Sequence, residues 1–333
     1  MTDDFPHRHT AHCESGTLSA LLRRHGCDLD EAMVFGLGRA LAFAYIPIVK
    51  LAGMPLISYR IPPGRIIANV CRSLNLRVQR QRFASPEKGM AALDAVLDAG
   101  DVAVLQTSVF WLPYFPAEMR FHFNAHNLLV YGKDGADYLI SDPVFEQAQR
   151  CRAEDLQRAR FAKGALAPKG LMYTLADAAA LHDVPQRLPQ LLRRAVAKNA
   201  RSMLAPVFFV GVRGMRTLSR RLAVLPEKHD EAHCRRYLGH IVRMQEEIGT
   251  GGAGFRYLYA CFLQQAADVC GETAWQRASQ ELTAIGDTWR EFAADCVRHC
   301  RQSPLDGLAD LAAQLHGLAQ REERLWRGLA AAS

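Results

Sequence analysis

The chain has 333 residues, of which 49% are hydrophobic and 23% are charged, and its formal net charge at pH 7 is +7. This composition is typical of a globular protein with a sizeable core and excludes an intrinsically disordered chain. The excess of basic over acidic residues favours an acidic partner. No nucleic-acid-binding motif is present in the sequence, so we expect no nucleic-acid partner.

Cysteine usage and apolar runs indicate where the protein works. Nine cysteines are scattered without a CxxC pair, which is not the pattern of a disulfide framework. The polar segment before Cys13 lacks the apolar core of a signal peptide. The longest apolar run, residues 32–57, contains Arg39, Lys50 and two prolines, so we interpret it as a buried element and predict no transmembrane segment. We therefore expect a cytoplasmic protein.

The first 145 residues mix helix and strand signals. An amphipathic helix follows Cys13 and stops at Gly26. Further signals predict a strand at 76–83, a helix at 85–100, a strand at 102–108, and a hairpin of strands at 127–131 and 137–140. Strands paired around a hairpin, with helices before them, indicate an α+β domain over residues 1–145.

After residue 145 the pattern changes. Residues 146–185 are irregular and predict a linker with one short helix at 153–160. Beyond it, the 3.6-residue periodicity predicts an all-helical domain over residues 186–333, in which only residues 206–212 resemble a strand. The predicted helices span 187–204, 212–225, 230–248, 255–270, 272–301 and 305–329.

Three residues of the first domain form a chemical constellation. Cys13 stands at the start of a helix, where the helix dipole and unpaired N–H groups lower a thiol pKa. His126 opens the first strand of the predicted hairpin and Asp142 follows the second, which makes them neighbours in space. A thiol, an imidazole and an orienting carboxylate are the components of nucleophilic cysteine catalysis. We therefore predict Cys13, His126 and Asp142 as catalytic residues.

Simpler interpretations exist for each of the three. Cys13 could be a small buried hydrophobe, His126 a histidine at a strand end, and Asp142 a turn former before proline. His122 lies four residues before His126 and competes for the role of base, although it falls outside the predicted hairpin.

The histidines near the N-terminus offer another alternative. His7, His9 and His12 together with Cys13 could bind zinc, which accepts imidazole and thiolate ligands. They lack partners elsewhere at standard spacing. We therefore predict no metal site.

Long segments of the chain resemble the butirosin biosynthesis protein H family. The similarity begins with HCESGTLSALLRRHGCDLDEAMVFGLGRALAF and continues through FHFNAHNLLVYGKDGADYLISDP and AEDLQRARFAKGALAPKG. It extends through GVRGMRTLSRRLA and GTGGAGFRYLYACFLQQAA into the helical domain usually fused to this one. The resemblance implies a papain-like fold, similar also to the peptidase domains of bacteriocin exporters, followed by an all-helical domain.

The resemblance also implies an activity. The family's namesake moves an aminoacyl group from the phosphopantetheine arm of an acyl carrier protein to an amine. By that resemblance Cys13 takes the acyl group, His126 acts as base and then acid, and Asp142 orients it. The implied partners are an acidic carrier protein and a small-molecule amine or hydroxyl acceptor, and a homodimer stays open. We expect no tightly bound cofactor, since acyl-phosphopantetheine arrives as substrate.

Two parts of such a site are less defined. Exporter peptidases use a glutamine upstream of the cysteine as an oxyanion donor, and this chain has none there. Beyond the Cys13 backbone N–H, the candidates for a secondary or oxyanion role are His12, Glu14 and His122. The aromatic residues of the apolar run that could line an acyl channel are Phe35, Phe43 and Tyr45.

The leading hypothesis is thus an amide-forming acyltransferase in secondary-metabolite or lipid-like biosynthesis. A cysteine hydrolase, either a peptidase or a thioesterase, would use the same three residues and let water resolve the intermediate. A noncatalytic interaction scaffold is the third hypothesis. Replacing Cys13 would abolish turnover under the first two and change nothing under the third.

Overall fold

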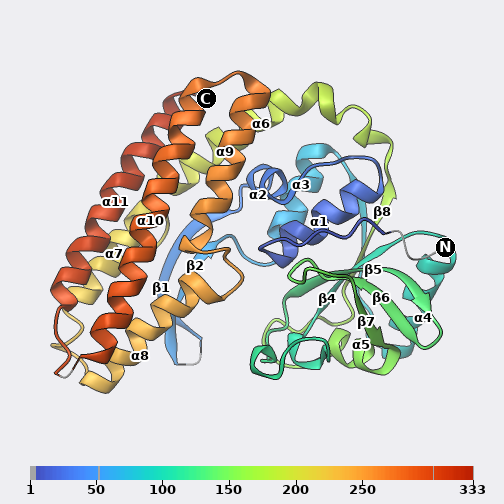
Figure 1. Cartoon of the computed structure of the whole chain (residues 1–333), viewed down its shortest axis with the longest axis horizontal. Coiled ribbons are helices and arrows are strands. Elements are labelled where there is room, and N and C mark those ends of the chain that lie inside the picture. The colour runs from blue at the N-terminus through green and yellow to red at the C-terminus, as the bar shows by residue number, and fades with distance from the viewer. Residues whose placement is uncertain (1–4, 52, 303, 333) are drawn as a thin grey trace. The chain divides into compact units, whose positions relative to one another are not determined.

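The computed structural model describes residues 5–51, 53–302 and 304–332, and the chain divides into two compact units. The first unit runs through Val34 and resumes over Ile66–Gln186. The second comprises Phe35–Arg65 and the chain from Arg187 onward. Each unit is therefore assembled from two separate stretches of sequence (Figure 1).

The first unit contains a six-stranded antiparallel sheet in the order β3-β8-β4-β5-β6-β7. The predicted hairpin is present as β5 and β6, and β4 pairs with β5 along its whole length. The central strands are rich in apolar residues because both of their faces are covered. The strands are β3 (Arg77–Gln81), β4 (Ala103–Thr107), β5 (His126–Asp134), β6 (Asp137–Ser141), β7 (Gln149–Arg152) and β8 (Met172–Asp177).

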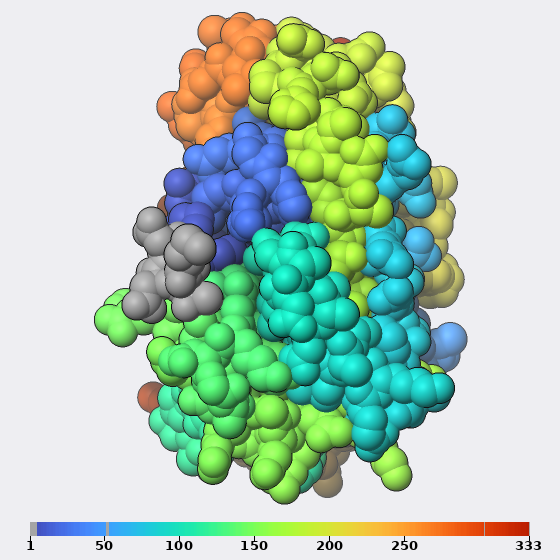
Figure 2. Space-filling model, turned by 90° about the vertical axis from the view of Figure 1, so that its right-hand side faces the viewer, coloured from blue at the N-terminus to red at the C-terminus, as the bar shows by residue number. Residues whose placement is uncertain are grey.

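Four helices accompany this sheet: α1 (Cys13–Arg24), α3 (Arg65–Leu74), α4 (Pro86–Asp98) and α5 (Ala153–Arg160). The start signals predicted for α4 are present, because the Ser85 hydroxyl accepts a hydrogen bond from the Lys88 N–H and Pro86 occupies the first helical position. α1 packs against β5 and β4. Figure 2 shows α1 (blue), α4 (teal) and the β5–β6 hairpin (green) on one face of this unit.

The sheet includes a segment that the sequence predicted to be a linker between domains. Residues 146–185, expected to form a linker, supply β7, α5 and β8 to the first unit. β8 lies between β3 and β4, so the sheet is complete only with this segment. The irregular spacing of these short elements hid them, because a strand of six residues gives a weak periodic signal.

The second unit is mainly helical. Figure 1 shows the long helices α7, α10 and α11 side by side, and α7 also contacts the β1–β2 hairpin. Its elements are β1 (Leu41–Leu51), β2 (Met54–Arg60), α6 (Val184–Met203), α7 (Gly211–Ala223), α8 (Glu231–Val242), α9 (Arg256–Cys270), α10 (Thr273–Arg301) and α11 (Leu308–Ala331). A π-helical turn, Arg243–Glu247, follows α8.

The apolar run 32–57 forms most of α2 (Glu31–Leu37) and then the β1–β2 hairpin. The interpretation as a buried element holds for Phe43 and Ile57 but not for the hairpin tip, where Ile48 is 88% exposed. The sequence did not predict this hairpin because proline is unfavourable within a strand. The β1–β2 register is in fact irregular between Ile46 and Lys50. Its membership in the second unit also departs from the predicted boundary at residue 145.

The predicted fold class is confirmed as a mixed unit of strands and helices together with a helical C-terminal region. The strand-like residues 206–212 form no strand and make one bridge, between Ala44 and Val210. Among the helices of the described residues, none combines the length and apolar character needed to cross a bilayer. All nine cysteines are free thiols.

Candidate active site

Cys13 is the first residue of α1, where backbone N–H groups have no partner within the helix. His12 is the N-cap residue in an extended conformation, and its Nδ1 accepts a hydrogen bond of 3.4 Å from the Ser15 N–H. The Cys13 side chain is buried. The thiol therefore lies at the positive end of the helix dipole and is shielded from water.

A glycine and a threonine fix α1 against the rest of the site. A Cβ atom on Gly16 would lie 1.9 Å from Thr10 Oγ1 and 2.8 Å from Pro143 Cβ, so only glycine allows this close approach. The Thr17 hydroxyl donates a hydrogen bond of 3.1 Å to the Asn127 carbonyl. These contacts bring the N-terminus of α1 to the start of β5 and the end of β6, which the sequence alone did not indicate.

His126 is the first residue of β5, and Asp142 directly follows β6, as the predicted hairpin requires. Imidazole Nε2 lies 2.7 Å from Asp142 Oδ2, and both side chains are buried. The Tyr114 hydroxyl donates to the same oxygen at 2.9 Å, and the Val144 N–H donates to Oδ1 at 3.3 Å. The carboxylate is thus held by three donors, and Nδ1 is the ring nitrogen left for the thiol. No sequence signal pointed to Tyr114.

The protonation of His126 reflects these neighbours. Burial by itself lowers the pKa of His126, because it penalises the imidazolium. The charge and hydrogen bond of Asp142 outweigh burial, and a hydrogen bond with the Cys13 side chain adds to them, so that the pKa of His126 is raised to about 10. The structure therefore brings Cys13, His126 and Asp142 together in an arrangement that favours an imidazolium at neutral pH.

A buried carboxylate supports the segment that leads into Cys13. Glu31 accepts hydrogen bonds from the Ala11 N–H at 2.9 Å, the His12 N–H at 2.7 Å and the Ser15 hydroxyl at 3.1 Å. Burial raises the pKa of Glu31 to about 7, against the opposing effect of these three donors. The only hint of this role in the sequence is an acidic residue that opens an apolar helix.

Glu14 has a different role from the one predicted. Its carboxylate is fully buried, and Oε1 accepts hydrogen bonds from the Ile66 N–H at 2.9 Å and the Ile67 N–H at 3.2 Å, which caps α3. A carboxylate can only accept such bonds, so Glu14 is not an oxyanion donor. His12 caps α1 through Nδ1, and its oxyanion role stays a prediction.

His122 does not compete with His126 for the position beside Asp142. It is exposed, and its ring stacks on Phe110 with centroids 4.1 Å apart. His126 occupies that position because the β5–β6 pairing places the start of one strand beside the end of the other.

The predicted acyl-channel residues are core residues of the second unit. Phe35, Phe43 and Tyr45 are each at most 2% exposed. Phe35 stacks on Phe255 at 5.1 Å, and Phe43 stacks on Trp289 at 6.1 Å. Side chains packed this closely leave no channel between them, so the prediction of an acyl channel there is wrong.

The histidines proposed as alternative zinc ligands make other contacts. His7 Nδ1 lies 2.8 Å from Ser141 Oγ, and its Nε2 lies 2.9 Å from the Phe145 carbonyl oxygen. Nowhere in the described part of the chain do three or more His, Cys, Asp or Glu side chains gather as a metal site would require.

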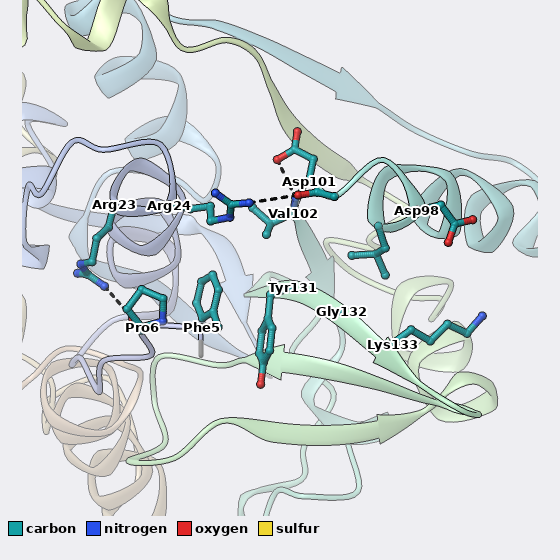
Figure 3. Close-up of a pocket in the computed structure, with 12 residues that line it drawn as sticks. Phe5, Pro6, Arg23, Arg24, Asp98, Asp101, Val102, Tyr131, Gly132 and Lys133 are labelled. Atoms are coloured by element: carbon teal, nitrogen blue, oxygen red, sulfur yellow. Dashed lines mark hydrogen bonds between the residues drawn. The ribbon is translucent and has the colours of Figure 1, made fainter. Parts of the chain in front are cut away.

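A pocket of about 650 Å³ lies at the opposite end of α1 from Cys13 (Figure 3). Arg24, at the C-terminal end of α1, donates a hydrogen bond of 3.2 Å to the Gly100 carbonyl at its wall. Its charges are mixed, since Asp98 and Asp101 line it together with Arg24 and Lys133. None of the three predicted catalytic residues lines this pocket.

Comparison with known proteins adds two family matches. The family described as "Butirosin biosynthesis protein H, N-terminal" matches residues 12–143, and "Domain of unknown function (DUF4872)" matches residues 154–329. A crystal structure of a C39-like peptidase from Bacillus anthracis aligns with a TM-score of 0.36 and 13% sequence identity, covering 52% of this chain and 95% of that one. No curated protein sequence shows significant similarity to the chain.

Proposed function

This chain belongs to the DUF4872 family, its residues 12–143 match the N-terminal domain of butirosin biosynthesis protein H, and from that premise we propose that it is a cysteine-dependent acyltransferase. The family and the site geometry together support a papain-like cysteine enzyme. The finer proposal is that the acyl group comes from the phosphopantetheine thioester of an acyl carrier protein. Its acceptor is a small-molecule amine or hydroxyl.

In the first half-reaction Cys13 reacts as a thiolate paired with the His126 imidazolium, which holds the proton on Nδ1, and the thiolate attacks the carbonyl carbon of the donor thioester. The resulting oxyanion is stabilised by the Cys13 backbone N–H at the start of α1. When the tetrahedral intermediate collapses, the bond to the arm's sulfur breaks, and this sulfur takes the proton from the imidazolium. The products are acyl-Cys13 and the free arm thiol.

In the second half-reaction an amine attacks the acyl-Cys13 thioester. His126 accepts the proton that the amine nitrogen loses, and the bond between the carbonyl carbon and Cys13 Sγ breaks to leave the amide and a thiolate. Asp142 stabilises the imidazolium in both halves and keeps Nε2 occupied, so that Nδ1 is presented to the reacting atoms.

The observation that carries the proposal is the buried Asp142–His126 pair, whose imidazole pKa is raised by Asp142 and also by the side chain of Cys13 at a helix N-terminus. The matched family's name supports a biosynthetic role, and acyl transfer suits such a role better than hydrolysis does. The net charge of +7 suits a carrier protein of opposite charge, because complementary charge accelerates encounter.

Intact-protein mass spectrometry after incubation with acyl-pantetheine and acyl-carrier thioesters tests the proposal. We expect an acyl adduct on the wild type and none on Cys13→Ala. Cys27→Ala is the matched control, because Cys27 is also buried near an end of α1. Its adduct should equal that of the wild type.

Adding candidate amines to the isolated adduct separates the remaining alternatives. Loss of the adduct with formation of an amide supports the transferase. Release of free acid at a rate independent of amine identifies a hydrolase. If chemically diverse thioesters yield neither adduct nor thiol release, the protein is an interaction scaffold and the proposal is wrong.

A further inference from the structure

The first unit contains a second pocket, of about 590 Å³, with a strongly basic lining. Arg82, Lys163 and Lys169 contribute three positive charges, and the lining residues, all of them described, include no carboxylate. This differs from the mixed charges of the pocket at the end of α1. A cavity with one sign of charge concentrates ligands of the opposite sign.

The floor of this basic pocket is rigid. Phe161 lies between Gly89 and Gly170, and a Cβ atom on either glycine would come within 2.6 Å of its ring. Arg82 donates a hydrogen bond of 3.1 Å to the Pro168 carbonyl, which anchors the loop that forms the rim. The floor of the pocket is thus a built feature of the fold, and its three cations are exposed side chains around it.

The rim loop has an unusual backbone. Leu166 and Lys169 have φ values of 55° and 53°, and Gly164 and Gly170 are also in the left-handed region. Non-glycine residues rarely adopt this conformation, and such strain concentrates at ligand-binding sites. Lys169, which lines the pocket, is one of these left-handed residues.

The pocket and the predicted catalytic residues lie at the same end of the sheet. The β4–β5 register pairs Thr107 with His126, and the loop before β8 adjoins that end of β4, because the Gln106 N–H donates to the Leu171 carbonyl. Asn124, two residues before His126, donates through Nδ2 to the carbonyls of Lys163 and Ala165 at 3.2 Å and 2.8 Å. The side chain of Asn124 therefore couples the rim loop to the strand that carries the imidazole.

The spacing between β3 and β5 is similar to the length of a phosphopantetheine arm. Three strand spacings separate β3, which leads into Arg82, from β5, and they amount to about 14 Å. The phosphopantetheine arm has roughly the backbone length of a four-residue extended peptide, also about 14 Å between its phosphorus and its sulfur. The arm is thus long enough to reach from the end of β3, beside the three cations, to the strand that carries His126.

We propose that the basic pocket binds the phosphate that links the phosphopantetheine arm to the carrier protein, an inference that rests on the proposed function. Guanidinium and ammonium groups recognise phosphate oxygens through charge-assisted hydrogen bonds. The pocket positions the donor thioester for attack by Cys13. It also distinguishes a carrier-bound acyl group from thioesters that lack the phosphate.

Calorimetric titration of the full chain with 4′-phosphopantetheine and with pantetheine isolates the contribution of the phosphate without any acyl transfer. We expect 4′-phosphopantetheine to bind at least tenfold more tightly. Lys163→Gln and Lys169→Gln should each reduce this preference by roughly three- to tenfold, since both side chains are exposed, and should leave pantetheine binding unchanged. Equal binding of the two probes to the wild type would overturn the inference.

Two control titrations establish where the phosphate binds and what else the pocket recognises. Lys133→Gln removes the same charge at the opposite end of β5, in the mixed-charge pocket, and should retain the full preference. If it loses the preference instead, the phosphate binds there and the inference is wrong. Inorganic phosphate should bind much more weakly than 4′-phosphopantetheine, and equal affinity would reduce the pocket to a simple phosphate site.

The outcomes also separate this inference from the proposed function. Acylation of Cys13 by acyl-pantetheine, without a preference for the phosphorylated donor, supports the transferase and rejects the pocket's role. Preferential binding of 4′-phosphopantetheine without any acylation supports the pocket and counts against the transferase.

Discussion

Asp142 in the first unit and Glu322 in the second are both fully buried carboxylates held by several donors. Asp142 accepts hydrogen bonds from His126, Tyr114 and the Val144 N–H. Glu322 accepts bonds of 2.9 Å from Arg256, 2.8 Å from Trp289 and 3.1 Å from Trp326. The two clusters differ in the chemistry of their cation and in what lies beside it.

The cation beside Glu322 cannot take part in proton transfer. The Arg256 guanidinium lies 4.9 Å from the centroid of the Trp289 ring and 5.5 Å from that of Tyr59, and a guanidinium has no basic nitrogen to accept a further proton. His126 is an imidazole that can give up its proton, and the thiol of Cys13, which we propose as the nucleophile, is close enough to raise the pKa of His126. A buried ion pair thus indicates a reactive site only where its cation titrates and adjoins a reacting group.

The largest effect should follow the loss of charge at Asp142. Asp142→Asn keeps the shape of the side chain but removes the anion that stabilises the imidazolium, so we expect acylation of Cys13 to slow by about 10³-fold. Timed mass spectrometry of adduct formation measures this rate. Asp134→Asn, on the exposed end of the same hairpin, is the control and should react normally. A decrease of less than tenfold for Asp142→Asn would contradict the role assigned to it.

The corresponding change in the second unit should affect stability and not chemistry. Glu322→Gln leaves the Arg256 charge buried without a counterion, so we expect the free energy of unfolding to fall by about 3–5 kcal/mol. Urea denaturation of the full chain measures it. Glu323→Gln, on the partly exposed neighbouring residue, should cost less than about 1 kcal/mol. A slower acylation rate per folded Glu322→Gln molecule would mean that the two clusters are not independent.

Of the two clusters, only the one that contains His126 should make the free energy of unfolding depend on alkaline pH. The imidazole of the unfolded chain loses its proton near its ordinary pKa of 6.5, whereas folded His126 keeps it until about pH 10. The contribution of His126 to stability is therefore fully present below pH 6.5, and the free energy of unfolding falls as pH rises toward 10, by about 2 kcal/mol between pH 7 and 9. Denaturation at a series of pH values should show a weaker slope for His126→Gln and an unchanged slope for Glu322→Gln.

The smallest expected effect concerns one donor to Asp142. Tyr114→Phe removes the hydroxyl that shares Oδ2 with His126, and we expect it to cost about 1 kcal/mol in stability and to slow acylation roughly threefold to tenfold. Tyr257→Phe removes a hydroxyl bonded to exposed Asp287 and is the matched control. An unchanged acylation rate in Tyr114→Phe would show that two donors suffice to hold the carboxylate.

The sequence was most informative where a site depends on local geometry. His126 and Asp142 flank one hairpin, so their contact follows from strand pairing alone. Cys13 was identified from the start signal of a single helix. The predicted helices of the C-terminal half also agree closely with α6–α11, because each long helix carries its own periodicity.

Contacts between distant segments could not be predicted in this way. Glu14 caps α3 across more than fifty residues, and Tyr114 reaches Asp142 from a loop without regular periodicity. The residues next to such a side chain in the sequence do not indicate which distant residue it will contact. Phe43 was misassigned for the same reason, since an aromatic residue of a core and one of a ligand channel have identical sequence patterns.

The position of β8 constrains how this protein can be made and rearranged. Among the described strands, β3 pairs with β8 alone, so during translation the hydrogen-bonding edge of β3 lacks this partner until Met172–Asp177 has left the ribosome. Segment Phe35–Arg65 likewise waits for the helices encoded after it. A gene cut after residue 143, where the first family match ends, would deprive the sheet of an internal strand. The two units can therefore be inherited or exchanged only together.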